Sequence, residues 1–417
     1  MKDKIWWKLF IDKQIYQIFF MKVLYANPIF LDYRIPFFKK LVELFNGEFY
    51  ILYSTQRYKG RFDDLLKRIP NELGRNAIAY ENEKIFYFNS LSFKYKAKAS
   101  EKKKKLFPYA IPFAFGLLKT VKRQRPDVLI TEGFYQWTPL ICRYAHKHKV
   151  PLYLSYERTL YTERNVGKLK TLERKWIDKF IAGYLVNGRA TSEYLLSLGV
   201  SPDRIFIAGM SADSDGLRQA IMNFPESEKI YFRKKYQRDK GLIFLFSGQM
   251  IVRKGVDHLL ESWMQHIKKF PFDKLILIGG GPLYDQYFQR YCSVPSIFLE
   301  GRIPYSEVYK YYAIADVFIL PTIEDNWSLV VPEAMACGLP IATSIYNGCH
   351  YELVQKGING ITFDTFRHDT IIDALEYFHT QNLDEFGKNS IRLEELFNTD
   401  NSAKRVYYTI VNSCMSK

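Results

Sequence analysis

The sequence predicts an α/β protein with two doubly wound parallel sheets. From residue 21 onward, short apolar segments of strand length alternate with longer amphipathic segments. This alternation is typical of parallel strands joined by helical crossovers. The strand-like segments form two series, separated by a polar and charged stretch at about 212–240. A chain of 417 residues also exceeds one ordinary core, and two domains of about 200 residues each are expected.

The predicted strands are placed by their apolar and β-branched residues. The first series comprises residues 22–26, 49–53, 84–88, 127–131, 151–155, 184–188 and 204–208. The second series comprises residues 242–248, 274–280, 296–300, 317–321, 340–344 and 360–364. We expect two Rossmann-like domains that face each other across a cleft.

Domain boundaries follow from the stretches that lack a strand pattern. We expect an N-terminal domain over residues 21–220 and a C-terminal domain over residues 221–395, with a linker and docking helix where they join. The tail is expected to be helical, with a C-terminal helix over residues 396–417 that can pack back on the N-terminal domain. Residues 1–20 are an extension before the strand at Met21. They are either an interfacial amphipathic helix or an ill-ordered segment.

Charge and cysteine content restrict the class of protein. The chain has 60 Lys+Arg against 44 Asp+Glu, a net charge of +16. This surplus favours an anionic partner, which is nucleic acid, an anionic membrane or a phosphorylated ligand. No helix-turn-helix, zinc or RNA-binding signature accompanies the charge, so no nucleic-acid partner is expected. The five cysteines have no CxxC or metal-ligand spacing, and we expect reduced thiols and no metal site.

The loops after the strands of the second series carry the candidate ligand groups. After residues 242–248, a flexible turn from Gly248 to Gly255 places Arg253 and Lys254 before an amphipathic helix. A helix N-terminus with adjacent cations is a ready phosphate site. After residues 274–280, a glycine-rich turn allows close approach of the backbone, although many turns share this pattern.

The stretch EDNWSLVVPEAMACGLP, residues 324–340, combines carboxylates with a short helix. Pro332 suits the first helical turn and Gly338 suits the C-terminal cap. Glu333 is either an ordinary first-turn residue favoured by the helix dipole or a site residue. Asp325 lies eight positions earlier, and a loop of this length can direct both carboxylates into one crevice.

Four motifs in order resemble the retaining glycosyltransferases of family 4, which have the GT-B fold. PTIEDNWSLVVPEAMACGLPIATS resembles the family's E-x7-E region, and SGQMIVRKGVDHLLES resembles its phosphate segment. LILIGGGPL and FLEGRIPYSEVYKYYAIADVFILPT resemble the segments between these two. In the N-terminal half, RPDVLITEGF and YERTLYTERN are also similar to this family. The resemblance covers roughly residues 21–380.

The resemblance implies roles for individual residues. Glu333 matches the position that holds the donor ribose, Asp325 the contact to the donor sugar, and Lys254 a phosphate-binding cation that stabilises the leaving group. The other implied donor-binding residues are Gly248, Gln249, Arg253, Gly280, Arg302, Ile303, Asn326, Trp327, Ser328 and Leu329, of which the last four offer backbone N–H groups to the diphosphate.

Two residues depart from the family pattern. Asp325 stands where glutamate is usual, which puts the sugar contact in doubt, and Glu324 is an adjacent alternative. Gln249 stands where arginine is usual, and glutamine cannot neutralise a diphosphate. Arg253 either compensates for Gln249 or is a solvated charge before a helix.

The acceptor site of such enzymes lies mainly in the N-terminal domain. The candidates there are Asp32, Arg34, Glu157, Glu163 and Arg164, and a structural ion pair is the alternative for Glu163 and Arg164. The usual histidine after residues 151–155 is absent.

A dense lysine cluster, Lys102–Lys105, lies among aromatic residues in the segment 93–125. It is either a solvated loop before an apolar helix or an attachment to an anionic membrane surface, with Phe107, Tyr109 and Phe113 entering the interface. The membrane reading is favoured.

The implied function is transfer of a sugar from a nucleotide sugar to a glycan or lipid-linked acceptor with retention of anomeric configuration. UDP- or GDP-sugars are the expected donors, with no cofactor and no metal. The expected setting is cytoplasmic, at the inner face of the cell membrane, in envelope polysaccharide or glycolipid synthesis. The alternative is a non-catalytic GT-B binding protein or an inactive glycosyltransferase subunit.

Overall fold

We describe the protein from a computed structural model. It describes residues 21–60, 62–88, 109–134, 137–212, 214–236 and 240–415. The described residues form two compact units: one contains residues up to 155 together with 179–182, and the other contains 156–178 and 183–417. The expectations for residues 1–20, for Lys102–Lys105 and for Phe107 lie outside the described residues. The predicted domain boundary near residue 220 stays a prediction.

The first sheet has seven strands in the order β3-β2-β1-β6-β7-β8-β9. Its strands are β1 (Val23–Ala26), β2 (Phe49–Ser54), β3 (Ala77–Tyr80), β6 (Val128–Glu132), β7 (Leu152–Tyr156), β8 (Gly183–Val186) and β9 (Ile205–Ile207). The central strand β1 pairs in parallel with both β2 and β6. Its four residues are buried, as expected for a parallel strand covered on both faces.

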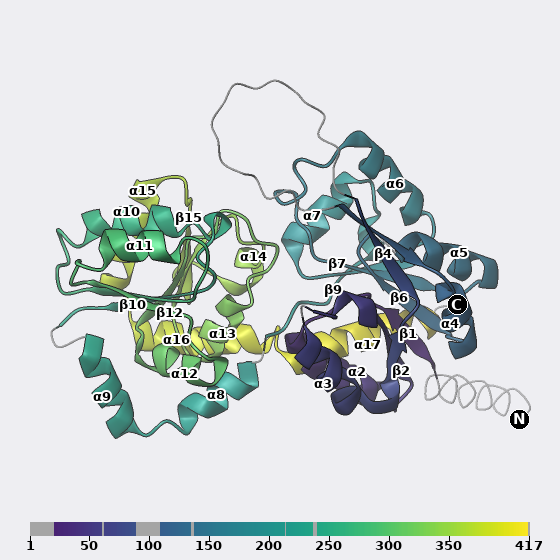
Figure 1. Cartoon of the computed structure of the whole chain (residues 1–417). Helices are drawn as coiled ribbons and strands as arrows, with labels where there is room; N and C mark the ends of the chain where they lie inside the picture. The colour runs from purple at the N-terminus through teal and green to yellow at the C-terminus, as the bar shows by residue number, and fades with distance from the viewer. Residues whose placement is uncertain are drawn as a thin grey trace, which may run out of the picture. The chain divides into compact units, whose positions relative to one another are not determined.

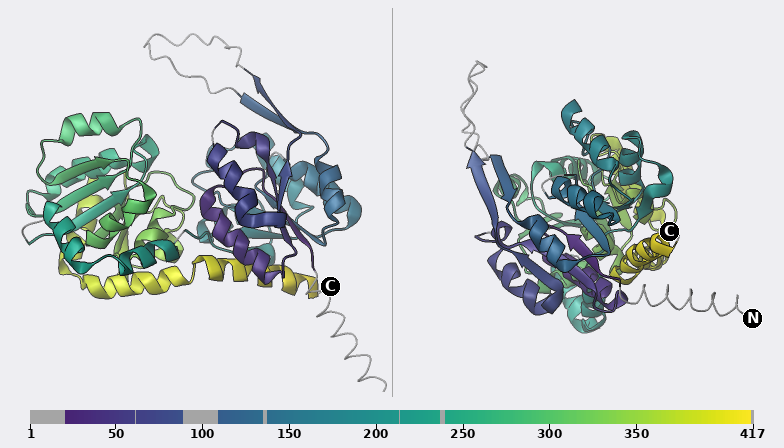
Figure 2. Two further views of the ribbon diagram at one scale, coloured as in Figure 1. Left: turned by 60° about the horizontal axis from the view of Figure 1, so that its bottom comes forward. Right: turned by 90° about the vertical axis from the view of Figure 1, so that its right-hand side faces the viewer.

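The prediction for residues 84–88 is wrong in one respect. The segment is a strand, β4 (Glu83–Phe88), but it pairs antiparallel with β5 (Tyr109–Ala114) in a separate two-stranded sheet. Figure 2 shows this hairpin as a ribbon of its own. In the large sheet, the strand that pairs with β2 at the edge is β3 instead. Most residues of β3 are only partly buried, so its sequence has no strong apolar pattern. After the lysine cluster, residues 109–114 form β5 and residues 117–124 form a helix, and the choice between a solvated loop and membrane attachment stays a prediction.

The second sheet has six strands in the order β12-β11-β10-β13-β14-β15. Its strands are β10 (Ile243–Ser247), β11 (Lys274–Ile278), β12 (Ile297–Gly301), β13 (Val317–Leu320), β14 (Ile341–Ser344) and β15 (Gly360–Phe363). Every neighbouring pair is parallel. All six strands lie where the sequence predicts them.

Helices connect these strands. Those between strands of the first sheet are α2 (Ile35–Leu44), α3 (Asp63–Leu73), α4 (Leu117–Gln124), α5 (Thr138–His148), α6 (Lys168–Asp178) and α7 (Arg189–Ser197). Two more, α8 (Ser214–Met222) and α9 (Glu226–Tyr236), occupy the expected linker region. No described helix has both the length and the apolar character needed to cross a membrane.

The second sheet is covered on both faces. Its helices are α10 (Val256–His266), α11 (Tyr284–Tyr291), α12 (Tyr305–Ile314), α13 (Val330–Ala336), α14 (His350–Leu353), α15 (His368–Tyr377) and α16 (Leu383–Glu395). The helix after them, α17 (Thr399–Met415), contacts the end of the first sheet, where Arg405 Nε donates to the Ala208 carbonyl just after β9 at 3.2 Å. Figure 1 shows α10, α11 and α15 on one face and α12, α13 and α16 on the other. This doubly wound arrangement leaves the ends of the strands as the place for a ligand.

Candidate donor site in the second sheet

The loops after β10 and β13 meet at the carboxyl edge of the second sheet. β10 lies between β11 and β13, so the strand order reverses direction at this point. In open α/β sheets, ligands bind beside such a reversal. Lys254, on the loop after β10, places Nζ 2.7 Å from Oδ2 of Asp325, on the loop after β13. The topology therefore joins two predicted site residues that are 71 positions apart.

A cavity of about 700 Å³ opens at this edge of the sheet. It is lined by Ser247, Gly248, Gln249, Ile251, Ile278, Gly279, Gly280, Gly281, Pro282, Arg302, Ile303 and Val308. Five of the predicted donor-binding residues are in this lining. The volume lies within the range of small-molecule and cofactor sites.

The floor of the cavity is made by backbone, because the loops after β10 and β11 touch directly. Gly279 has φ +131°, and a Cβ there would lie 1.9 Å from the carbonyl oxygen of Gly248. The Met250 N–H donates to the Gly280 carbonyl at 2.9 Å. Any side chain at residue 279 would push the loops apart. The glycine-rich turn is thus required by the close approach of two loops.

Lys254, Asp325 and Ser328 form a compact polar cluster beside this cavity. The Asp325 carboxylate accepts hydrogen bonds from Lys254 Nζ at 2.7 Å and from Ser328 Oγ at 2.6 Å. The Lys254 and Asp325 side chains are each only 12% exposed. Burial by itself raises the pKa of Asp325, but the Lys254 charge and the two hydrogen bonds outweigh it and hold the pKa below its ordinary value. Asp325 is therefore ionised at neutral pH.

The chain positions Lys254 through a short 3-10 helix, η5 (Val252–Lys254), and the glycine that follows it. Gly255 has φ +65°, and a Cβ there would lie 1.9 Å from the carbonyl oxygen of Pro321. The Arg253 carbonyl accepts hydrogen bonds from the Ile323 N–H and the Thr322 hydroxyl, each at 2.9 Å. These contacts fix η5 against the loop after β13.

Arg253 also faces the loop after β13. Its Nη1 lies 3.6 Å from Asp325 Oδ2 and donates to the Glu324 carbonyl at 3.3 Å. The side chain is half exposed, so the guanidinium remains accessible to a bound anion. Gln249 lines the cavity and Arg253 does not, and compensation of Gln249 by Arg253 stays a prediction.

Glu333 lies in the first turn of α13, as predicted. Its Oε2 accepts a hydrogen bond from the Tyr312 hydroxyl at 3.3 Å. Burial and the Glu333 charge raise the pKa of Tyr312 well above its ordinary value, so this tyrosine stays a hydrogen-bond donor. The helix ends as expected, with Gly338 at φ +79° just after it. Glu333 lies outside the cavity lining.

A comparison with known families matches about a third of the chain, around this site. Residues 241–381 match the family model described as glycosyl transferases group 1. These residues are a glycosyl transferases group 1 domain.

Relatives of the group 1 domain carry glycosyltransferase names. The chain is 31% identical over 147 residues to an uncharacterized glycosyltransferase, MJ1607, of Methanocaldococcus jannaschii, which covers 34% of this chain and 36% of that protein. It is 28% identical over 173 residues to the alpha-monoglucosyldiacylglycerol synthase of Acholeplasma laidlawii, covering 41% and 42%. The chain therefore spans less than half the length of these curated relatives.

Solved structures show the fold of the whole chain. Alr3699/HepE of Anabaena, in complex with UDP, matches with a TM-score of 0.69 at 13% identity, covering 94% of this chain and 100% of that one. At this identity the likeness concerns the fold alone. The fold class is GT-B, and the prediction from the sequence is confirmed.

Trp327 and Ser328, in the loop of the group 1 domain between Asp325 and α13, are buried. Trp327 packs against Phe397, with ring centroids 5.8 Å apart. The Ser328 N–H donates to Asn347 Oδ1 at 3.2 Å, so it is already used, against the prediction that it offers itself to a diphosphate. Leu329 is the N-cap residue of α13. Asn326 Oδ1 and Trp327 Nε1 are buried and have no hydrogen-bond partner among the described residues.

The first sheet has an equivalent reversal, where β1 lies between β2 and β6. Glu132 ends β6, and its Oε2 contacts the Tyr25 hydroxyl and lies 3.5 Å from Arg34 Nη2. Burial and Glu132 raise the pKa of Tyr25. Arg34, in the 3-10 helix η1 (Asp32–Arg34), thus contacts the end of β6. Asp32 is exposed, 3.9 Å from Arg68, and the acceptor roles of Asp32 and Arg34 stay predictions. Sequence reasoning missed Glu132, although a polar residue at the end of VLITE was an available signal.

The other acceptor candidates have structural partners. Glu163 is buried between Arg174 at 2.8 Å and Arg158 at 3.3 Å, which supports the structural alternative over a place in the acceptor site. Arg164 forms an ion pair with Glu324 at 2.7 Å. Glu324 is the residue that was the alternative to Asp325 for the contact to the donor sugar. The Glu157 carbonyl accepts a hydrogen bond from Thr191 at 2.9 Å.

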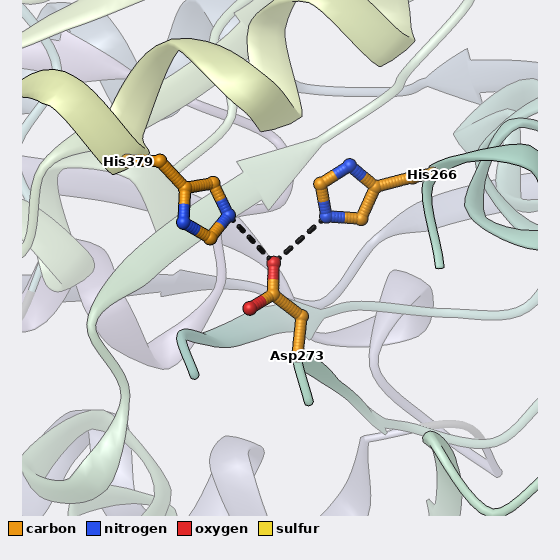
Figure 3. A group of neighbouring side chains, drawn as sticks. All are labelled: His266, Asp273 and His379. Atoms are coloured by element: carbon orange, nitrogen blue, oxygen red, sulfur yellow. Dashed lines mark hydrogen bonds and ion pairs between the residues drawn. The ribbon is translucent and has the colours of Figure 1, made fainter. Parts of the chain in front are cut away.

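A group of side chains that could hold a metal lies at the opposite end of β11, which Asp273 precedes (Figure 3). His266 Nε2 and His379 Nε2 each lie 2.8 Å from Asp273 Oδ2. Asp273 Oδ1 accepts from the Leu242 N–H at 2.9 Å. With a proton on each Nε2, the carboxylate is satisfied by N–H donors alone, and a hydrogen-bonded clasp explains the cluster. The sequence offered no signal, because His379 is 106 positions from Asp273.

Proposed function

We propose that this protein transfers a sugar from a nucleotide-sugar donor to a glycan or lipid-linked acceptor with retention of anomeric configuration. The observation that carries this proposal is the backbone-floored cavity beside the Lys254–Asp325 pair, within a group 1 domain. A flat base and ribose fit against a floor without side chains, and the diphosphate fits near Lys254 and Arg253. The relatives' glycosyltransferase names and the UDP complex of the structural neighbour support the same assignment.

The chemistry assigned to this site is stabilisation of the leaving nucleoside diphosphate. Asp325 holds the Lys254 ammonium group in place through their ion pair at 2.7 Å. A diphosphate that arrives competes with this carboxylate for Lys254 and gains the nearby Arg253 as a second cation. Cations positioned in advance stabilise developing charge without reorganisation at the moment of reaction. We assign Glu333 to the donor ribose and Asp325 or Glu324 to the donor sugar.

The acceptor is proposed to be lipid-linked or a glycan of the cell envelope. The relative from Acholeplasma laidlawii is named alpha-monoglucosyldiacylglycerol synthase. A lipid acceptor lies in a membrane, and the net charge of +16 on this chain favours contact with an anionic membrane surface. We place the protein in the cytoplasm at the inner face of the cell membrane. The exposed Phe113 and Phe115, 44% and 59% exposed on and just after β5, support contact of this hairpin with an interface.

The test is a transfer assay with UDP-, GDP- and ADP-sugars and lipid-linked acceptors, with the anomeric configuration of the product read by NMR. Nucleotides that bind should first raise the melting temperature. Glu333→Ala should reduce turnover strongly. Product with inverted configuration would reject retention.

Gln249 in the cavity lining is the observation that favours the second candidate, a non-catalytic GT-B binding protein. That candidate predicts a nucleotide-dependent rise in melting temperature with neither transfer nor donor hydrolysis. Gln249→Arg should then raise nucleotide affinity without producing turnover.

A further inference from the structure

Helix α6 presents an apolar ridge to solvent. Leu169 is 83% exposed, Leu172 63% and Trp176 45%. Their spacing of three and four residues places them on one side of the helix. An ordinary amphipathic helix buries such a stripe against the core, and here the orientation is reversed.

The inward face of α6 is fixed by a buried charge. Arg174 Nη1 donates to Glu163 Oε2 at 2.8 Å and contacts the Tyr194 hydroxyl of α7. Ile177 is buried beside it. Rolling the helix to bury its leucines would pull Arg174 out of this network and leave Glu163 buried and short of a partner, which is strongly unfavourable. The exposed ridge is therefore the stable arrangement of this unit.

The polar residues around the ridge are mainly cationic. Lys168, Lys170 and Lys175 are exposed, and Glu173 is the exposed acidic residue of the helix. Lysine side chains can lie along an apolar surface while their ammonium groups reach out to headgroups. Tryptophan favours the boundary between hydrocarbon and water. A basic helix with leucine and tryptophan on its outer side matches an anionic bilayer better than it matches a protein groove.

We propose that α6 is a membrane-contact helix: Leu169, Leu172 and Trp176 enter the interface of an anionic bilayer, and the flanking lysines contact lipid phosphates. This inference rests on the membrane association in the proposed function and names a second contact element besides the hairpin of β4 and β5. Figure 1 shows α6 and α7 in the same unit, where Arg174 of α6 contacts Tyr194 of α7.

The experiment uses the full chain with two kinds of vesicle: phosphatidylcholine alone, and phosphatidylcholine with about 30 mol% phosphatidylglycerol. The wild-type protein should float with the anionic vesicles and stay behind with the neutral ones. Each leucine contributes about tenfold or more to the partition coefficient, so Leu169→Ser/Leu172→Ser should lower it by about 100-fold.

The matched control is Met222→Ser/Leu396→Ser, which removes two exposed apolar side chains outside α6, 73% and 53% exposed. It should float like the wild type. Lys168→Gln/Lys175→Gln should weaken binding to anionic vesicles. The binding that remains should depend less on salt concentration than wild-type binding does. A blue shift of tryptophan emission on adding anionic vesicles should shrink in Trp176→Phe.

Three results would overturn the assignment. The assignment fails if the wild-type protein does not float with anionic vesicles. It also fails if the leucine variant floats with them as well as the wild type does. A wild-type dimer that the leucine variant dissociates would show that a second copy covers the ridge instead. Nucleotide-induced melting shifts and transfer to a water-soluble acceptor should persist in the leucine variant. If no variant and no wild type shows transfer, the proposed function fails while the flotation result still decides the role of α6.

Discussion

Removing Lys254 separates the structural and chemical parts of the proposed donor site. Lys254 Nζ and Asp325 Oδ2 are 2.7 Å apart, and both side chains are 12% exposed. At an effective dielectric constant of about 20, the attraction between these charges is about 6 kcal/mol before desolvation is subtracted. Breaking a buried pair by removing one partner costs about 3 kcal/mol or more, because the other charge is left buried. Lys254→Ala should therefore lower the melting temperature by several degrees.

The double variant Lys254→Met/Asp325→Asn removes both charges and keeps similar side-chain volumes. It should recover most of the lost stability, because no buried charge is left unpaired. If Lys254 stabilises the leaving group, turnover of the double variant should remain about 100-fold or more below that of the wild type. The measurements are urea or thermal unfolding and single-turnover transfer with saturating donor. Recovery of turnover in the double variant would refute the chemical role of Lys254, and unchanged stability in Lys254→Ala would refute the electrostatic reasoning.

The other predictions concern backbone approach, pH and the histidine cluster. Gly279→Ala should cost about 3 kcal/mol and abolish the nucleotide-induced melting shift, because its Cβ would lie 1.9 Å from a carbonyl oxygen; the control Gly357→Ala, at φ +78° with nothing within 4 Å, should cost about 1 kcal/mol and leave the shift intact. Burial raises the pKa of Glu394 from 4.5 to about 7, so the folded state binds the proton more tightly. The protonated Glu394 carboxyl group contributes about 3 kcal/mol of folding stability below about pH 4.5, and this contribution is lost as the pH rises through about 7. Glu394→Gln should make the folding stability nearly constant over this pH range. A pH profile of stability that does not change in the variant would contradict the argument. His379→Gln keeps an N–H donor for Asp273 and should melt near the wild type, with no effect of added Zn²⁺ on either; a zinc-dependent rise present only in the wild type would show that the clasp is a metal site.

Local sequence pattern was sufficient for the second sheet. Each strand there is a short apolar run followed by a helix-length connection, and every neighbouring pair is parallel. Such strands are buried on both faces, so their signal is strong. The end of the short helix α13 was also predictable, because a glycine commonly follows the last residues of a helix. Gly338 indeed has φ +79°, a conformation that favours a residue without Cβ.

The pairing of β4 was not predictable from its own residues. Its apolar run suits either a parallel or an antiparallel partner, and the partner β5 follows a long lysine-rich segment. β3 was missed because a half-buried strand has a weak pattern. Strand choice depends on contacts distant in sequence, which a local pattern does not contain.

The sequence by itself determined the α/β class, the strands of the second sheet and the loops that carry the candidate donor residues. Only the tertiary structure decided which of those residues meet: Lys254 with Asp325 across the reversal at β10, and Arg34 with Glu132 across the reversal at β1. It also decided that Glu163 is a buried structural partner of Arg174, and consequently that α6 turns its leucines outward. The physical reason is that burying a charge is costly unless a partner from elsewhere in the chain is present, and that partner is known only once the chain is folded.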